Sequence, residues 1–401
     1  MRICMVLPHF YPYVGGAEKM FYDLAVGLAN RGHEVRVVAK RVDALHDGKV
    51  SFSGIDVWYC DWRELFGHPL PKRRDVEAHI RWCDIVHTST FTPAHIVSVL
   101  AAKYGKPSVM TVHEVHGDKW YWVDNPLRAS GFYLYETYVC RQPYDMYHAV
   151  SEATRKDFYR FIAGGRKEAF DVRRVYLANE MRPKETQAPK PIDLYEYFGI
   201  DRGKKVFLFY GRPGKTKGIY VYEEAILRLF RASAEASADT EFARALADTR
   251  FCFILGSEPA KLRRRFVERV KKNGMETFMP VRDSLDRERL SACILQADYV
   301  VVPSVTEGFG LSALEACQMG KRLIYSNAGS LPEVVYGEVL EFKNRDAADL
   351  AERLREVIQN GARAFTHIPE KKFTYDAMIG GIEELYMELM KKKKETGRHA
   401  G

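Results

Sequence analysis

The amino-acid sequence predicts an α/β protein of two domains, each a parallel sheet wrapped by helices, with the carboxyl ends of the two sheets facing a central cleft. The chain has 401 residues, about two to three times the usual length of one domain. Short apolar runs alternate with helix-length segments, which is typical of parallel sheets covered on both faces. This alternation breaks once, in a polar stretch at 181–191 whose three prolines indicate a linker.

The first domain is predicted to span residues 1–188. A helical pattern at Glu18–Arg31 separates its first two strands. Apolar runs bounded by turn residues predict strands at Ile3–Leu7, Val35–Ala39, Asp56–Cys60, Ile85–Thr88, Ser108–Val112, Met146–Val150 and Arg174–Ala178.

The second domain is predicted to span residues 192–372. Its strands are expected at Val206–Tyr210, Phe251–Leu255, Thr277–Pro280, Tyr299–Val302, Leu323–Ser326 and Val339–Phe342. The Ala-rich segment Glu223–Asp248 is long for one crossover helix, so we expect two helices there. In the remaining residues, 373–401, a helix after Tyr375 is expected to cross back to the first domain and to end in a basic tail.

Composition excludes several classes of protein. Hydrophobic residues make up 46% and charged residues 28% of the chain, which excludes a disordered, collagen-like or disulfide-scaffold protein. No apolar run is long enough to span a bilayer. The seven cysteines form no Cys-x-x-Cys pair and are expected to be reduced. Because the N-terminus resembles a buried strand and not a cleavable signal, we expect a cytoplasmic protein.

The net charge is +8 and is spread along the chain, apart from the run Lys391–Lys394. A mild excess of this kind suits anionic ligands or an anionic membrane surface, but it lacks the dense stripe of a nucleic-acid binder. The lysine run itself is either a solvated helix end or a membrane contact.

The most informative segment runs from Val301 to Ala316. A strand ends near Pro303, a loop carries Glu307, and a helix is expected to begin near Leu311. Free N–H groups at such a helix start bind phosphate well. Glu307 precedes the helix and can reach a polar group of the ligand, whereas Glu315 lies about one turn inside, where it can accept two hydroxyls of a ribose.

A second glycine-rich turn follows the strand that ends at Tyr210. Arg212 can grip phosphate oxygens in a bidentate manner, and Lys217 adds a point charge. Exposed basic residues in an ordinary surface turn are the competing interpretation.

The first domain offers two weaker candidates. Gly15 and Gly16, between the first strand and the first helix, would let backbone amides face the cleft. His113 follows the strand at Ser108–Val112 and could donate to a ligand hydroxyl. Together with Glu114, His116 and Asp118 it could also be a metal ligand, although no helix supports that spacing.

Taken in order, these segments resemble glycosyltransferase family 4, retaining enzymes of the GT-B fold. The resemblance covers nearly the whole chain. It rests on the glycine-pair loop Pro12–Glu18, on Thr111–His113, on Ala149–Glu152, on Gly211–Arg212 with Lys217–Gly218, and on a Glu-x7-Glu signature from Glu307 to Glu315.

The resemblance implies a nucleoside diphosphate sugar as donor, bound mainly by the second domain. Arg212 and Lys217 would neutralise the leaving diphosphate. Glu315 would hold the ribose, and Glu307 and His113 the donor sugar. The further donor-binding residues are expected to be Gly15, Gly16, Gly211, Gly308, Phe309, Gly310 and Leu311.

The resemblance also implies a mechanism. The acceptor hydroxyl attacks the front face of the donor sugar, and a donor phosphate oxygen takes its proton. No metal or other cofactor is expected, because the chain lacks the Asp-x-Asp pair with which single-domain sugar transferases usually hold a diphosphate-bound metal.

We therefore expect a retaining hexosyltransferase that moves a hexose from a UDP- or GDP-linked sugar to an acceptor hydroxyl in lipid-linked or cell-surface glycan synthesis. Three alternatives stay open: transfer to a small soluble acceptor, as in sucrose or trehalose synthesis; a GT-B sugar-nucleotide epimerase; and a non-catalytic sugar-nucleotide-binding protein.

The acceptor is expected to be a glycan or a lipid-linked molecule, with peripheral contact to the inner face of the membrane and no nucleic acid as partner. Trp120–Trp122 with 132–135 could form an apolar acceptor surface, and Pro69–Arg74 with Arg81 could meet anionic headgroups. Core aromatics and a solvated loop are the competing interpretations of these two segments.

Overall fold

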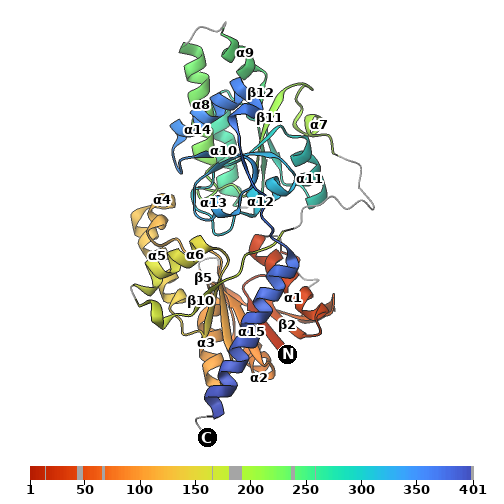
Figure 1. Ribbon diagram of the computed structural model, residues 1–401, viewed down its shortest axis with the longest axis vertical. Coiled ribbons are helices and arrows are strands. Elements are labelled where there is room, and N and C mark those ends of the chain that lie inside the picture. The colour runs from red at the N-terminus through yellow and green to blue at the C-terminus, as the bar shows by residue number, and fades with distance from the viewer. Residues whose placement is uncertain are drawn as a thin grey trace. The chain divides into compact units, whose positions relative to one another are not determined.

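The computed structural model describes residues 1–13, 15–42, 48–65, 68–164, 166–179, 192–235, 240–257 and 259–398. The chain divides into two compact units (Figure 1). Unit 1 comprises Met1–Ala178 and Phe373–Gly401, and unit 2 comprises Asn179–Lys372. The predicted linker at 181–191 lies outside the described residues.

Unit 1 is built on an eight-stranded sheet of order β10-β9-β8-β7-β1-β2-β4-β3. Every neighbouring pair is parallel except β3 and β4. The strands are β1 (Arg2–Leu7), β2 (Glu34–Lys40), β3 (Gly48–Phe52), β4 (Ile55–Cys60), β7 (Ile85–Ser89), β8 (Ser108–Val112), β9 (Met146–Ala149) and β10 (Val172–Arg174). A separate two-stranded sheet pairs β5 (Arg63–Leu65) with β6 (His68–Leu70).

Helices surround this sheet. They are α1 (Gly16–Asn30), α2 (Arg73–Trp82), α3 (Pro93–Lys103), η1 (Gly117–Lys119), α4 (Trp120–Val123), α5 (Pro126–Cys140), α6 (Glu152–Asp157), the π-helix η2 (Phe158–Ala163), η3 (Lys167–Ala169) and α15 (Tyr375–Arg398).

The last helix, α15, lies beside α1 (Figure 1). Gly27 allows this close approach, because a Cβ atom there would lie 2.2 Å from the Ile379 Cδ1 atom. Glu383 of α15 accepts hydrogen bonds from Arg31 and from the His33 ring, each at 2.7 Å. The C-terminal helix is therefore an integral part of unit 1.

Unit 2 has a seven-stranded sheet of order β13-β12-β11-β14-β15-β16-β17, in which only β17 is antiparallel to its neighbour. The strands are β11 (Lys205–Gly211), β12 (Thr249–Leu255), β13 (Val281–Asp283), β14 (Tyr299–Val302), β15 (Arg322–Ser326), β16 (Gly337–Phe342) and β17 (Thr366–Ile368). The helices are α7 (Leu194–Phe198), α8 (Ile219–Glu235), α9 (Glu241–Ala247), α10 (Ala260–Lys272), α11 (Arg287–Gln296), α12 (Leu311–Gln318), α13 (Leu331–Val334), α14 (Ala347–Asn360) and η4 (Gly361–Ala364).

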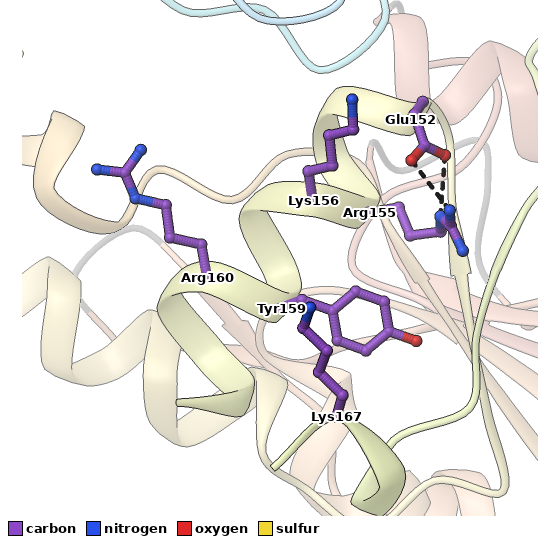
Figure 2. A pocket seen from close by; sticks show the side chains of 6 residues that line it. All are labelled: Glu152, Arg155, Lys156, Tyr159, Arg160 and Lys167. Atoms are coloured by element: carbon purple, nitrogen blue, oxygen red, sulfur yellow. Dashed lines mark hydrogen bonds and ion pairs between the residues drawn. The ribbon is translucent and has the colours of Figure 1, made fainter. Parts of the chain in front are cut away.

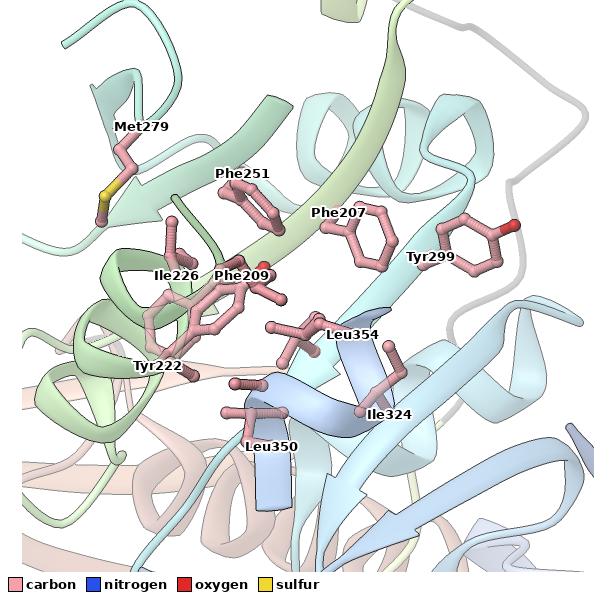
Figure 3. Close-up of a cluster of buried hydrophobic side chains, with 14 of the residues drawn as sticks. Phe207, Phe209, Tyr222, Ile226, Phe251, Met279, Tyr299, Ile324, Leu350 and Leu354 are labelled. Atoms are coloured by element: carbon pink, nitrogen blue, oxygen red, sulfur yellow. The ribbon is translucent and has the colours of Figure 1, made fainter. Parts of the chain in front are cut away.

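The core of unit 2 shows why β11 forms a central strand. Its residues Phe207 and Phe209 point to one face, where they meet Tyr222 of α8 and Leu354 of α14 (Figure 3). Val206 and Leu208 alternate with them and are equally buried. Burial on both faces is the property that the continuous apolar run predicted.

The two-sheet α/β architecture is confirmed, and three strand predictions need correction. The run Thr277–Pro280 is not a strand: Met279 donates from its backbone to the Met275 carbonyl at 2.7 Å, and these apolar side chains enter the core from a turn. Pro280 has no N–H group, so the ladder of β13 begins only at Val281.

The second correction concerns β10, which covers Val172–Arg174 and not the predicted Arg174–Ala178. The third is that the edge strands β3 and β17 and the β5–β6 pair were not predicted. The residues of β3 and β17 are largely exposed, and none of these segments has a continuous apolar run. Among the described helices, none has an apolar stretch long and uncharged enough to cross a bilayer.

Candidate functional site

In unit 2, the two most informative loops follow adjacent strands. From β11 the chain leads to β12 on one side of the sheet and returns later through β14 on the other side. Such a reversal of strand order opens a crevice at the carboxyl ends of the two strands, where open α/β sheets bind ligands. The loop after β11 carries Arg212 and Lys217, and the loop after β14 carries Glu307.

These two loops are held together by their backbones. The Thr216 carbonyl accepts hydrogen bonds from the Val305 N–H at 2.7 Å and from the Thr306 N–H at 3.3 Å. Gly218 has φ +68°, and a Cβ atom there would lie 1.6 Å from the Pro303 carbonyl oxygen. Only glycine fits this position, because it needs both the left-handed conformation and the missing side chain.

Lys217 and Glu307 form an ion pair across the two loops. The Lys217 ammonium donates to both carboxylate oxygens of Glu307 at 2.8 Å. The side chains are 26% and 11% exposed, so solvent screens the pair only in part. Glu307 thus offsets the charge of Lys217, one of the basic residues that follow β11.

Arg212 is different from Lys217. It follows directly after β11, is exposed, and has no hydrogen bond or ion pair with any described residue. A guanidinium presents a fork of N–H donors that matches phosphate oxygens. Arg212 is therefore available to an incoming anion without breaking a contact, as is the exposed Lys215 further along the same loop.

Helix α12 begins at Leu311, as predicted. Gly310 precedes it with φ +95°, and no side chain caps the helix. The loop before it is fixed by a third segment: Ser330 donates from its N–H to the Glu307 carbonyl at 3.2 Å, and a Cβ at Gly329 would lie 2.2 Å from the same oxygen. Gly308 and Phe309 are buried within this loop. The start of α12 thus combines the positive end of the helix dipole with a preceding loop whose backbone is held in place, and both properties favour an anionic ligand.

Glu315 lies on α12 and has a partner that the sequence did not reveal. Asn179 donates from Nδ2 to the Glu315 Oε1 atom at 2.8 Å, and its own Oδ1 accepts from Arg287 at 3.0 Å. Asn179 is 2% exposed. The amide therefore fixes the orientation of the carboxylate proposed to bind ribose, and one buried polar residue beside a predicted linker was too weak a signal to assign that role.

In unit 1, Gly15 and Gly16 start helix α1. Gly15 is its N-terminal cap with extended φ −166°, and its carbonyl accepts from the Lys19 N–H at 2.9 Å. Further along α1, the Phe21 ring meets the His113 ring edge-on, with centroids 5.8 Å apart. The first helix and the histidine after β8 therefore lie at one edge of the unit 1 sheet.

His113 is neutral and holds an unused hydrogen-bonding atom. Burial, together with the nearby His148, lowers the pKa of His113 to about 3. Its Nε2 atom is buried and has no hydrogen-bond partner among the described residues. A buried polar atom without a partner calls for a ligand group or an ordered water. The geometry suits a neutral imidazole that bonds a hydroxyl.

A chain of buried hydrogen bonds lies beneath His113. The His148 Nε2 atom must donate to the Val175 carbonyl, at 2.9 Å. Its Nδ1 then accepts from Thr111, at 2.9 Å, which leaves Thr111 to accept from the His87 Nε2 atom at 2.7 Å. His87 Nδ1 accepts in turn from the Tyr386 hydroxyl of α15 at 2.5 Å. Because the Val175 carbonyl can only accept, it fixes the position of every proton in this series of hydrogen bonds.

A buried carboxylate also shapes the loop after His113. Glu136 of α5 is 1% exposed and accepts from the backbone N–H groups of His116 and Gly117, at 2.9 and 2.8 Å. Burial would lower the pKa of His116, but Glu114 and Glu136 outweigh it and raise that pKa. Among the residues that the structure describes, no group of three or more His, Cys, Asp or Glu side chains converges as metal ligands would.

The predicted residues thus fall into two sets. The structure brings Lys217, Glu307 and the start of α12 together in unit 2, with Arg212 and Glu315 on the same loops and helix. His113, Gly15 and Gly16 belong to unit 1. Sequence reasoning missed Asn179, Glu136 and the chain of buried histidines.

Two sequence-family models match the chain. The one described as Glycosyltransferase Family 4 matches residues 14–165, and the one described as Glycosyl transferases group 1 matches residues 196–372. Together the two matched segments account for most of the chain.

Individual proteins agree with these matches. The chain is 25% identical to a glycogen synthase of Mycobacterium tuberculosis over 91% of this chain and 87% of that protein. It is 21% identical to the GDP-mannose:cellobiosyl-diphosphopolyprenol alpha-mannosyltransferase of Xanthomonas campestris, over 80% and 77% of the two chains.

Among solved structures, Anabaena Alr3699/HepE in complex with UDP-glucose superposes with a TM-score of 0.68 at 16% identity, over 100% of both chains. This likeness and the two switch-point sheets establish the GT-B fold.

Proposed function

This chain belongs to glycosyltransferase family 4, and from that membership we propose that it transfers a hexose from a UDP- or GDP-linked sugar to an acceptor hydroxyl with retention of configuration. The observation that carries the proposal is the pair of loops after β11 and β14 in unit 2. They are fixed to each other through backbone hydrogen bonds, they lie at the switch point of the sheet, and they present Arg212, Lys217 and the start of α12.

Arg212 and Lys217 bind the leaving diphosphate in this proposal. Each charge-assisted hydrogen bond contributes about 1.5–3 kcal/mol, and in a partly enclosed site such preorganised donors stabilise the charge that develops as the sugar–phosphate bond breaks. Glu307 holds Lys217 in place before the donor arrives. Once the diphosphate shares the ammonium, the carboxylate can accept from a hydroxyl of the donor sugar.

Glu315, oriented by Asn179, accepts from the ribose hydroxyls. Gly211, Gly308, Phe309, Gly310 and Leu311 let the backbone approach the donor closely. In unit 1, neutral His113 bonds a hydroxyl of the donor sugar through its unpartnered Nε2 atom, and the amides of Gly15 and Gly16 contact the diphosphate.

The reaction is proposed to be a front-face substitution. The bond between the anomeric carbon and the phosphate oxygen breaks while the acceptor oxygen bonds to the same face of that carbon. The acceptor proton passes to the departing phosphate oxygen, so no side chain is needed as a base and the atoms and charges balance. In this scheme Arg212, Lys217 and α12 supply the positive charge, and a metal ion is not required.

The acceptor is proposed to be a glycan or a lipid-linked molecule at the inner face of the membrane. The relative from Xanthomonas campestris is named for a diphosphopolyprenol acceptor. In unit 1, the α4–α5 hairpin exposes apolar side chains, namely Tyr121 (47%), Trp122 (41%), Leu127 (85%), Leu134 (67%) and Tyr138 (51%). Exposed aromatic and aliphatic groups on one hairpin suit contact with lipid.

The terminal lysine run contributes less to such a contact than its sequence indicates. The Lys392 Nζ atom lies 3.4 Å from the Asp171 Oδ2 atom, and the Lys393 Nζ atom lies 3.2 Å from the Asp145 Oδ1 atom. Two of the four ammonium groups thus interact with carboxylates of unit 1.

One observation favours a soluble glycan acceptor instead. The matched protein of Mycobacterium tuberculosis is named a glycogen synthase. Co-sedimentation with phosphatidylglycerol vesicles separates the two proposals: binding that weakens when Trp122 and Leu127 are replaced by serine supports the membrane-linked acceptor, and no binding supports the soluble one.

Donor identity is tested by thermal shift against UDP, GDP and ADP and their glucose and mannose conjugates. We expect stabilisation by UDP or GDP compounds. Transfer measured with the preferred donor should persist in excess chelator, and the product should keep the anomeric configuration of the donor by proton NMR. Metal-reversible loss of transfer in chelator, or an inverted product, would contradict the proposed mechanism.

A further inference from the structure

Unit 1 carries a basic pocket that none of the predicted site residues lines (Figure 2). Its volume is about 480 Å³. It is lined by Glu152, Arg155, Lys156, Tyr159, Arg160 and Lys167. In Figure 2, Arg155 turns toward Glu152 while Lys167 reaches from η3 to the Tyr159 ring.

The charge of this pocket is unbalanced. Glu152 is its one carboxylate, and Arg155 already binds it in a bidentate manner at 2.9 and 3.0 Å. Lys156, Arg160 and Lys167 form no ion pair with any residue that the structure describes. Like charges around one cavity repel one another, and an anion that enters it removes this repulsion.

The backbone that carries the pocket is unusual. Helix α6 continues into the π-helix η2, which holds Tyr159 and Arg160. Phe158 and Ile162 of the same segment are fully buried in the core of unit 1. π-Helical turns are rare and occur frequently at functional sites. A second, independent feature therefore marks the segment that carries Arg160, directly after the helix that carries Lys156.

The same helix adjoins the loop of His113. Thr154 of α6 donates from Oγ1 to the His113 carbonyl at 3.5 Å. From Thr154 to Arg160 the chain advances by at most roughly 9 Å, because an α-helix rises roughly 1.5 Å per residue and the wider π-helical turn rises less. A sugar that places one hydroxyl near His113 and carries a phosphate can span such a distance.

We propose that this pocket binds the phosphate group of the acceptor, as a phosphate monoester or a diphosphate. The arginine fork and the two lysine point charges match the chemistry of phosphate oxygens. This inference rests on the proposed function, because it takes the acceptor hydroxyl to react near His113. The phosphate belongs either to a soluble sugar phosphate or to a lipid phosphate, and both present the same group to the pocket.

The test compares two triple variants that remove equal charge. The pocket variant combines Lys156→Gln, Arg160→Gln and Lys167→Gln. The control combines Lys261→Gln, Arg264→Gln and Lys372→Gln, three exposed residues of unit 2 that line neither this pocket nor the proposed donor loops. Both are built on Arg212→Gln, so that the donor loops contribute less phosphate binding. Melting temperatures verify that each variant is folded.

Two probes distinguish the source of the phosphate. One is glucose 1-phosphate in solution, titrated by calorimetry; the other is a polyprenyl monophosphate in phosphatidylcholine vesicles, measured by co-sedimentation. We expect the pocket variant to lose roughly tenfold or more in affinity for at least one probe, while the control variant matches its parent. Loss confined to the vesicles identifies a lipid phosphate, and loss confined to glucose 1-phosphate identifies a soluble one.

Equal affinities in the pocket and control variants, or no binding of either probe to the parent, would overturn the inference. Binding of UDP and GDP to the wild-type chain is measured in parallel. If neither nucleotide binds, the proposed function fails whatever the pocket does. If one binds and the pocket variant still retains both probes, the pocket proposal alone fails.

Discussion

The two units share one architecture, but their candidate sites are built differently. In unit 2, backbone hydrogen bonds and glycine contacts join two loops, and the charged groups Arg212 and Lys217 are accessible or partly so. In unit 1, the candidate residue His113 is a buried neutral histidine, and its neighbour His148 belongs to a series of buried hydrogen bonds between histidines and hydroxyls. Of the twelve histidines in the sequence, His367 is the one that belongs to unit 2.

This difference shows which part of a site depends on charge and which on burial. The unit 2 loops need positive charge at a fixed position, so replacing Arg212, or a glycine that lets the loops approach each other, should impair them. The unit 1 site needs uncharged imidazoles, so acid should damage it first.

The largest expected effect is therefore a loss of unit 1 stability in acid. Burial lowers the pKa of His148 to about 4 and that of His113 to about 3. At pH values between the ordinary pKa of histidine and these lowered values, the unfolded chain binds protons that the folded chain does not. The free energy of unfolding therefore falls as the pH falls. Each of the two removes about 2 kcal/mol from the free energy of unfolding between pH 7 and pH 5, and His116, whose pKa is raised, opposes them.

The protein is equilibrated in increasing urea at each pH and then labelled by a short hydrogen-exchange pulse at one common pH. Mass spectrometry of the peptides gives the unfolding midpoint of each unit separately. His367→Gln, in unit 2, should leave the pH dependence of unit 1 as it is. An unfolding midpoint of unit 1 that stays constant or rises in acid would show that the histidines are not held neutral.

The next largest effect concerns the junction of the unit 2 loops. Gly218→Ala forces a side chain against the Pro303 carbonyl and should cost roughly 3 kcal/mol or more of unit 2 stability. Gly274→Ala is the matched control, since Gly274 has a similar φ of +65° with open space around it; it should cost only about 1 kcal/mol. Equal destabilisation of the two variants, measured by urea unfolding, would show that the loops are not in close contact.

A third prediction concerns catalysis. Arg212→Ala or Lys217→Ala should lower turnover by roughly a hundredfold or more, since each removes a donor to the leaving diphosphate. Melting temperatures should change little for Arg212→Ala, because this side chain is exposed and has no described partner. Near-normal turnover in both variants would remove these residues from the proposed mechanism.

The smallest effect is expected at the ribose. Glu315→Ala should weaken nucleotide binding by roughly tenfold, with a smaller change in turnover at saturating donor. Asn179→Ala, which removes the hydrogen bonds to both Glu315 and Arg287 but leaves the Glu315 carboxylate in place, should give a weaker version of the same change. Calorimetry with the preferred nucleotide measures both, and an unchanged affinity in Glu315→Ala would exclude the ribose contact.

Elements with strong local signals were predicted from the sequence, and elements held by distant contacts were not. The start of α12 at Leu311 and the strands β8 and β14 were predicted at their observed bounds, because glycines and continuous apolar runs are local signals. The short edge strand β17 was missed, since its residues are largely exposed and it is held by pairing with β16. Edge strands of this kind leave little local pattern in a sequence.

Contacts between residues that are far apart in the sequence could not be predicted either. Asn179 and Glu315 are 136 positions apart, and Tyr386 and His87 are 299 positions apart. Nothing local to these residues encodes such a contact, which arises only when the sheet and its helices assemble. The basic pocket had a visible signal, the cations of residues 155–160 interleaved with aromatic residues, but its unbalanced charge emerges only once η3 brings Lys167 to it.

The loops after β11 and β14 are proposed to bind the diphosphate of a sugar nucleotide through Arg212. The most direct measurement compares, by calorimetry, the affinities for a nucleoside diphosphate and for the corresponding nucleoside, in the wild-type chain and in Arg212→Ala, with Lys261→Ala as control. We predict a strong preference for the diphosphate in the wild type and in the control, and loss of most of that preference in Arg212→Ala. An equal preference for the diphosphate in all three proteins would show that Arg212 does not bind it.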